Sequence, residues 1–143
     1  MKVDNGDWDV RCPEELKELF PKRVGYYYRV NHDIAEKVLK ILSDTYQIPA
    51  PKLAKITNGS KEYAKYVYHS GTIMLRSWNH LKTVFHEFYH HLDNMTNGMY
   101  NSDDREGGST SLSWMFADQL WAKFTLRTNY PKSRIRRNEN QTM

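Results

Sequence analysis

Residues 77–98 read SWNHLKTVFHEFYHHLDNMTNG, and this stretch constrains the fold more than any other part of the chain. Its apolar side chains recur every three or four residues, which is the spacing of one face of an α-helix. Ser77 or Asn79 can cap the start of such a helix through a side-chain oxygen, and Asn97-Gly98 is a typical helix end. The sequence therefore predicts an amphipathic helix. Its apolar face consists of Leu81, Val84, Phe85, Phe88, Leu92 and Met95.

Two histidines, His86 and His90, lie four residues apart on this helix and away from its apolar face. Four residues turn a helix slightly more than one revolution, so both imidazoles project from the same side. That separation suits two ligands of one tetrahedral zinc ion. Glu87 lies between them and can act as general base on a zinc-bound water, then pass the proton to a leaving amine. The expected cofactor is Zn²⁺, and the expected reaction is hydrolysis of a peptide bond.

The pattern His-Glu-x-x-His also occurs by chance, so the elements around it matter. Two predicted strands, Tyr63–His69 and Thr72–Ser77, come directly before the motif helix. A helix from Asn31 to Gln47 precedes them, and a final helix at 109–127 follows the motif. The predicted fold class is α+β. It consists of a small sheet of three or four strands packed on a backing helix and on the motif helix, followed by a C-terminal helix.

With these elements around the motif, residues 63–124 resemble the HExxH zinc metallopeptidases, the zincins. The pattern is most similar to minimal gluzincin-like domains such as the ImmA/IrrE-like and SprT-like groups, and residues 116–120 (FADQL) resemble the FAxxL stretch of the ImmA/IrrE group. The resemblance implies a zincin-like fold, a peptide or protein substrate, and a third metal ligand from a later helix. It also implies a strand beside the motif helix that pairs with the substrate backbone, and Thr72–Arg76 stands in that place as an expected edge strand.

Glu106 is the expected third ligand of the zinc. The metzincin extension HExxHxxGxxH is absent, because Asp93 stands where its glycine would be and Thr96 where its histidine would be. In the ImmA/IrrE pattern the third ligand is a glutamate with a small residue three positions on, and Glu106 is followed by Ser109 at that distance. The alternative ligands are Asp93, Asp103 and Asp104.

Several neighbours of the motif have expected supporting roles. His91 falls beside the apolar face, which predicts a hydrogen-bonded core residue and not a ligand. Asp93 lies one turn beyond His90 and could orient it as a carboxylate behind the metal ligand. The tyrosines at 63–68 are predicted to be packing residues. The expected donors to a transition-state oxyanion are Tyr100 or Arg105.

Composition favours one globular domain over residues 1–128. The 143 residues are 39% hydrophobic and 27% charged, which is compatible with a core and with a single domain. The one cysteine, Cys12, excludes an intramolecular disulfide, and no apolar run approaches the roughly 20 residues that span a bilayer. No signal-peptide pattern is visible at the N-terminus, so the expected location is cytoplasmic.

Residues 129–143 are predicted to form a basic and flexible tail. They contain four basic side chains and one acidic side chain, Glu139, and so account for most of the formal net charge of +4. Basic tails can contact nucleic acid through its phosphates, so nucleic acid is an expected alternative partner. The alternative function is a catalytically retired zincin that acts as a protein-binding or nucleic-acid-associated factor.

Overall fold

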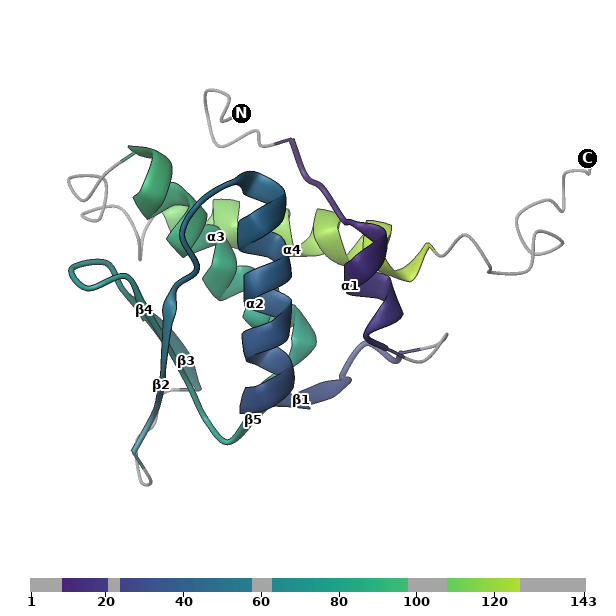
Figure 1. Cartoon of the computed structure of the whole chain (residues 1–143), viewed down its shortest axis with the longest axis horizontal. Helices are drawn as coiled ribbons and strands as arrows, with labels where there is room; N and C mark the ends of the chain where they lie inside the picture. The colour runs from purple at the N-terminus through teal and green to yellow at the C-terminus, as the bar shows by residue number, and fades with distance from the viewer. Residues whose placement is uncertain (1–8, 21–23, 58–62, 98–107, 127–143) are drawn as a thin grey trace, which may run out of the picture.

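The computed structural model of this chain describes residues 9–20, 24–57, 63–97 and 108–126, and it has a mixed α+β architecture (Figure 1). The elements in chain order are α1 (Glu14–Glu18), β1 (Arg29–Asn31), α2 (His32–Tyr46), β2 (Lys52–Lys55), β3 (Ala64–Val67), β4 (Thr72–Leu75), β5 (Trp78–His80), α3 (Leu81–Asn97) and α4 (Gly108–Thr125). The predicted α+β class is therefore confirmed for this part of the chain. The predicted tail lies outside the described residues.

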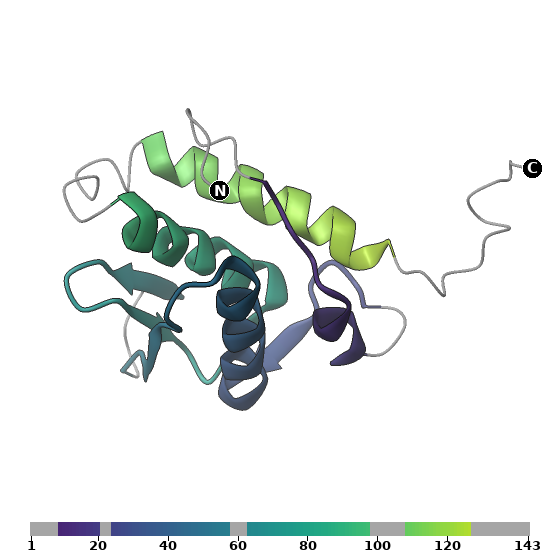
Figure 2. The same ribbon diagram turned by 45° about the horizontal axis from the view of Figure 1, so that its top comes forward.

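Helix α3 lies at the centre of the molecule, with α4 along one side and the three-stranded sheet on the other (Figure 2). The reason is its apolar face, because Leu81, Val84, Phe85, Phe88 and Leu92 are all fully buried. Met95 departs from the prediction: it lies in the last turn of α3 and is 38% exposed, so the buried face ends at Leu92. The motif is thus carried by the most buried helix of the fold.

Helices α2 and α4 form where the sequence predicted them. The side chain of Asn31 accepts a hydrogen bond from the backbone N–H of Ile34 and caps α2, while Gln47 ends it in the left-handed conformation (φ 58°). Helix α4 buries three residues at four-residue spacing, Phe116, Leu120 and Phe124. The ring of Phe124 packs edge-on against Phe85 of α3, which fixes α4 along the motif helix.

The strand that was expected at the edge of the sheet lies in its centre. β4 pairs in parallel with β2 on one side and antiparallel with β3 on the other, in the order β2-β4-β3. The prediction that Thr72–Arg76 offers free backbone groups to a substrate is therefore wrong. The short β3–β4 connection puts β3 beside β4, and the backbone of β2 covers the remaining side of β4. Within the described residues, β3 and β2 are the edge strands.

The start of α3 also differs from the prediction. Neither Ser77 nor Asn79 caps this helix, because residues 78–80 form strand β5 and pair antiparallel with β1. Asn79 is buried, and its side-chain Nδ2 donates instead to the carbonyl oxygen of Tyr63 at 2.8 Å. The local preference of Asn79 for a helix cap is therefore overridden by a tertiary hydrogen bond to Tyr63, which lies 16 residues earlier in the chain. This two-stranded β1–β5 ribbon leads directly into the motif helix.

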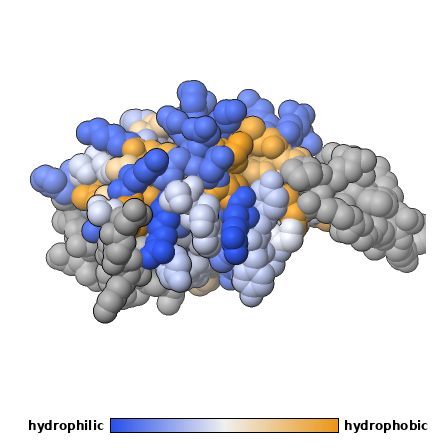
Figure 3. Space-filling view, turned by 90° about the horizontal axis from the view of Figure 1, so that it is seen from below, coloured by the Kyte–Doolittle hydropathy of each residue, from blue (hydrophilic) through white to orange (hydrophobic). Residues whose placement is uncertain are grey.

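No helix among the described residues is long and apolar enough to cross a membrane. Figure 3 shows one face of the molecule, on which hydrophilic side chains interrupt the apolar surface at many points.

Candidate metal centre

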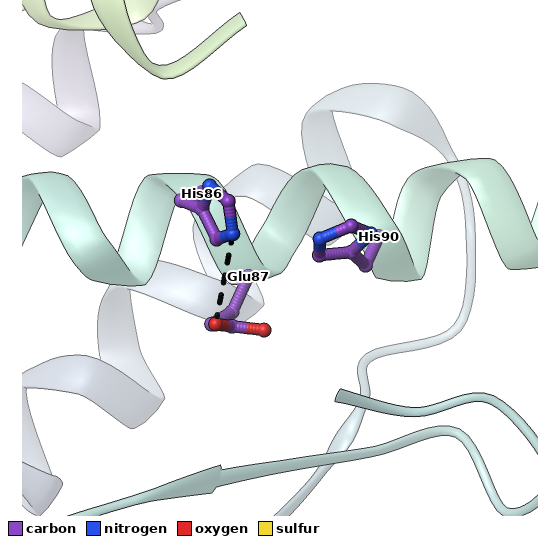
Figure 4. Close-up of side chains that lie close together, drawn as sticks. All are labelled: His86, Glu87 and His90. Atoms are coloured by element: carbon purple, nitrogen blue, oxygen red, sulfur yellow. Dashed lines mark ion pairs between the residues drawn. The ribbon is translucent and has the colours of Figure 1, made fainter. Parts of the chain in front are cut away.

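His86, Glu87 and His90 form a compact cluster on the buried side of α3. One ligand atom from each lies within 4.8 Å of the others, and the three residues are only 8%, 5% and 5% exposed. Figure 4 shows the two imidazoles one helical turn apart, with the Glu87 carboxylate reaching out from the helix beside them. Among the described residues, this cluster is the one group of three histidine, cysteine or acidic side chains whose ligand atoms lie close enough together to share a metal ion.

His86 is held as a neutral imidazole. Burial, assisted by the neighbouring His90, lowers the pKa of His86 from 6.5 to about 3. Its Nε2 lies 3.9 Å from Oε2 of Glu87, which is contact with a neutral ring and not an ion pair at neutral pH. Among the described residues its buried Nδ1 has no hydrogen-bond partner. A neutral histidine with an unshared ring nitrogen is the form that binds metals.

A hydrogen-bonded chain of three residues behind His90 orients its ring. Nδ1 of His90 lies 2.9 Å from the hydroxyl of Tyr68, and that hydroxyl donates to Oδ2 of Asp93 at 3.5 Å. When the Tyr68 proton is directed to Asp93, Nδ1–H of His90 donates to Tyr68 and the lone pair of the ring is on Nε2, where it can bind a metal. The side chain of Asn97 donates a hydrogen bond from Nδ2 to the other carboxylate oxygen of Asp93, Oδ1, at 2.7 Å. Metal-binding histidines commonly have such partners.

His91 is excluded as a ligand by its own hydrogen bonds. Nε2 donates to the backbone carbonyl of Pro49 at 2.7 Å, so Nδ1 is an acceptor and receives the Tyr66 hydroxyl proton, also at 2.7 Å. Asn94 donates in turn to the Tyr66 hydroxyl at 2.9 Å. Burial lowers the pKa of His91, which is consistent with a neutral ring that uses both nitrogens. The predicted core role of His91 is confirmed.

A cavity of about 650 Å³ borders two members of the cluster, His86 and Glu87. It lies between α3, the first residues of β3, the β1–β5 ribbon and Trp114 of α4, whose ring centroid is 4.1 Å from that of His86. Its lining residues are Arg29, Tyr63, Ala64, Trp78, Asn79, His80, Thr83, His86, Glu87 and Trp114. The buried cluster is therefore reached through a pocket large enough for part of a peptide, and an edge strand borders that pocket.

The other predicted site residues fall into two groups. Glu106, the expected third ligand, lies outside the described residues, as do the alternatives Asp103 and Asp104 and the expected oxyanion donors Tyr100 and Arg105. Asp93 lies behind His90, as expected of a supporting carboxylate, but it acts through Tyr68.

Sequence reasoning missed the roles of Tyr66 and Tyr68, which were predicted only to pack. Both are buried, yet their hydroxyl groups contact His91 and His90. A signal was present in the sequence, because residues two apart on a strand face the same side and a buried tyrosine hydroxyl needs a polar partner. Nothing in the sequence indicated that the motif helix would be that partner.

The donor set fits zinc. His86 and His90 offer two imidazole nitrogens, which zinc accepts in catalytic sites, and Glu87 places a carboxylate beside them. Comparisons with models of known protein families, with curated proteins and with solved structures find no match for this chain. The chemistry of the site must therefore be inferred from its own residues.

Proposed function

We propose that this protein is a zinc-dependent peptidase with a zincin-like site, in which His86 and His90 bind the metal and Glu87 is the general base. The observation that carries the proposal is the buried His86–Glu87–His90 cluster, which opens to a cavity beside an edge strand. Zinc bound there would polarise a substrate carbonyl and lower the pKa of a water ligand.

The roles of the protein's own groups follow from their surroundings. Glu87 lines the cavity from the same helix as both histidines, so its carboxylate can take a proton from the attacking water and return it to the departing amine. The contact between the Tyr68 hydroxyl and Nδ1 holds the ring of His90 in one orientation and leaves Nε2 for the metal. Trp114 covers one face of His86 and excludes water from that side of the ring.

The proposed binding strand for the substrate is β3 rather than β4. β3 is an edge of the described sheet, antiparallel to β4 in the register Ala64↔Leu75, and Tyr63 and Ala64 line the cavity together with Glu87. An extended peptide could add to this edge by backbone hydrogen bonds while its scissile bond faces the cluster.

Elemental analysis of the purified protein is the direct test. We expect close to one zinc per chain, and hydrolysis of an unfolded protein substrate that stops on chelation and returns when zinc is added. The proposal would be contradicted if the correctly folded protein contained no zinc and bound none when zinc was added by titration. Bound zinc without any hydrolysis would favour the retired, protein-binding alternative.

Tyr68→Phe is expected to weaken zinc affinity roughly ten- to hundredfold, because His90 loses the partner that orients its ring. The affinity is measured by competition with a chelator of known zinc affinity. Tyr66→Phe is the matched control, because it removes the equivalent hydroxyl from His91 and should leave zinc affinity unchanged. Equal effects of the two substitutions would show that the Tyr68 contact has no special relation to the metal.

Glu106 remains the proposed third protein ligand. Catalytic zinc sites typically have three protein ligands and an open position, and Glu106 precedes by two residues the helix whose Trp114 contacts His86. Glu106→Gln is expected to lower zinc affinity at least about tenfold, since removing even an indirect partner has that effect. Asp103→Asn and Asp104→Asn, measured with the same chelator competition, should differ little from wild type. A larger loss in either aspartate variant would transfer the role to that residue.

A further inference from the structure

One face of the β1–β5 ribbon forms a wall of the cavity. Arg29 pairs with His80 in the antiparallel register, and the next pair on the same face is Asn31 with Trp78, because side chains two residues apart share a face. The alternate residues, Val30 and Asn79, are buried on the opposite face, and of these two Asn79 also borders the cavity. Arg29, Trp78 and His80 all line the cavity that contains Glu87. Arg29 therefore lines the same cavity as His86 and Glu87.

The Arg29 guanidinium is stacked on an aromatic ring. Its Cζ lies 4.2 Å from the centroid of the Trp78 ring, which is a close cation–π contact between diagonal neighbours on two paired strands. A guanidinium that lies over a ring in this way can keep N–H groups at its edge for hydrogen bonds to another partner. Trp78 thus limits the positions that Arg29 adopts without using its hydrogen-bond donors.

Arg29 has no acidic partner among the described residues. The ion pairs of this part of the chain involve Arg11, Lys40 and Lys82, and none includes Arg29. Among the described residues that line the cavity, Arg29 is the one lysine or arginine and Glu87 is the one acid, which the proposed mechanism uses for proton transfer. Since no described residue forms an ion pair with Arg29, its permanent positive charge is available to a ligand in the cavity.

We propose that Arg29 binds a carboxylate of the substrate, either an acidic side chain or the C-terminal carboxylate, and so makes acidic or chain-terminal peptides the preferred ligands. This inference rests on the proposed peptidase function for its substrate class. A guanidinium that offers two parallel N–H groups matches the two oxygens of a carboxylate, and such charge-assisted pairs are roughly twice as strong as neutral hydrogen bonds. Lysine, as a point charge, cannot reproduce that geometry.

Binding is measured without hydrolysis, in the Glu87→Gln variant, by the fluorescence of the tryptophans. Trp78 and Trp114 line the cavity, so a bound peptide should change their emission. Three otherwise identical short peptides are compared: one with glutamate and an amidated end, one with glutamine and an amidated end, and one with glutamine and a free C-terminus. We expect at least one of the two peptides that carry a carboxylate to bind about tenfold more tightly than the neutral one. Which of them does so identifies the source of the carboxylate.

Arg29→Gln should remove this preference without weakening the neutral peptide, and Arg29→Lys should restore only part of it. Arg76→Gln is the control, because Arg76 is stacked on Tyr63 with its Cζ 4.5 Å from the ring but does not line the cavity. Thermal unfolding of each variant checks that the ribbon is intact.

The outcomes for the two proposals are separable. Equal affinities for all three peptides, no binding of any of them, or a preference that survives in Arg29→Gln would each overturn the carboxylate site, whatever the zinc content of the protein. A carboxylate preference that depends on Arg29, in a protein whose wild type hydrolyses none of the peptides, would support the Arg29 site and contradict the peptidase function.

Discussion

Replacing Glu87 by glutamine is expected to lower kcat/KM for peptide hydrolysis by roughly 10²–10⁴ while leaving zinc bound. Glutamine has nearly the same shape as glutamate, so the buried position beside His86 remains filled, but the amide cannot accept a proton from water. Hydrolysis of a fluorogenic peptide and the zinc content of the same preparation are the two measurements. Glu36→Gln, which makes the same change on the exposed surface of α2, should match wild type in both.

The result also decides between two roles for Glu87. Its carboxylate is close enough to both histidines to be a metal ligand itself, because the three groups lie within 4.8 Å of one another. A ligand role predicts loss of zinc in Glu87→Gln with the fold intact, whereas the general-base role predicts zinc retention with loss of turnover. Zinc loss would therefore contradict the assigned role, and unchanged turnover would contradict any catalytic use of Glu87.

The second large effect is expected at the adjacent pair His90 and His91. His90→Ala should reduce zinc affinity by more than the roughly ten- to hundredfold that loss of an orienting partner costs, because a direct ligand is removed. His91→Ala should keep its zinc, since both nitrogens of His91 are engaged by Pro49 and Tyr66. Zinc content after dialysis against a weak chelator distinguishes the two variants.

His91→Ala should instead lower stability. It leaves a cavity and removes a partner of the buried Tyr66 hydroxyl and of the Pro49 carbonyl, which we expect to cost roughly 2–4 kcal/mol of unfolding free energy. Urea denaturation of the metal-free variants measures this cost, and His90→Ala serves as the comparison. If His91→Ala lost the metal while His90→Ala retained it, the assignment of ligands on α3 would be wrong.

Several features of the fold could be read from local sequence because their causes are local. The motif helix, the helix capped by Asn31 and the C-terminal helix each show apolar residues at helical spacing, and their structures agree with those predictions. The strand pair β3–β4 was also recognisable, because a short turn joins two segments rich in β-branched and aromatic residues. In each case the information lies within about 20 consecutive residues.

Features that depend on distant segments could not be read in the same way. The central place of β4 requires β2, which is separated from it by the whole of β3 and pairs through backbone groups that every residue carries. The β5 strand forms because β1, about 50 residues earlier, pairs with it, and this overrides the capping preference of Asn79. Backbone pairing is nearly independent of side-chain identity, so the order of strands leaves little trace in a single sequence.

For the candidate site, the sequence by itself determined that His86, Glu87 and His90 lie together on one helix, because helical spacing alone brings residues one turn apart into proximity. Only the tertiary structure decided that Tyr68 and Asp93 orient His90, that Tyr66 and Pro49 occupy His91, and that Arg29 faces the same cavity. These contacts join segments that are far apart in the chain, and the packing of the β-strands against α3 is what brings them within hydrogen-bonding distance.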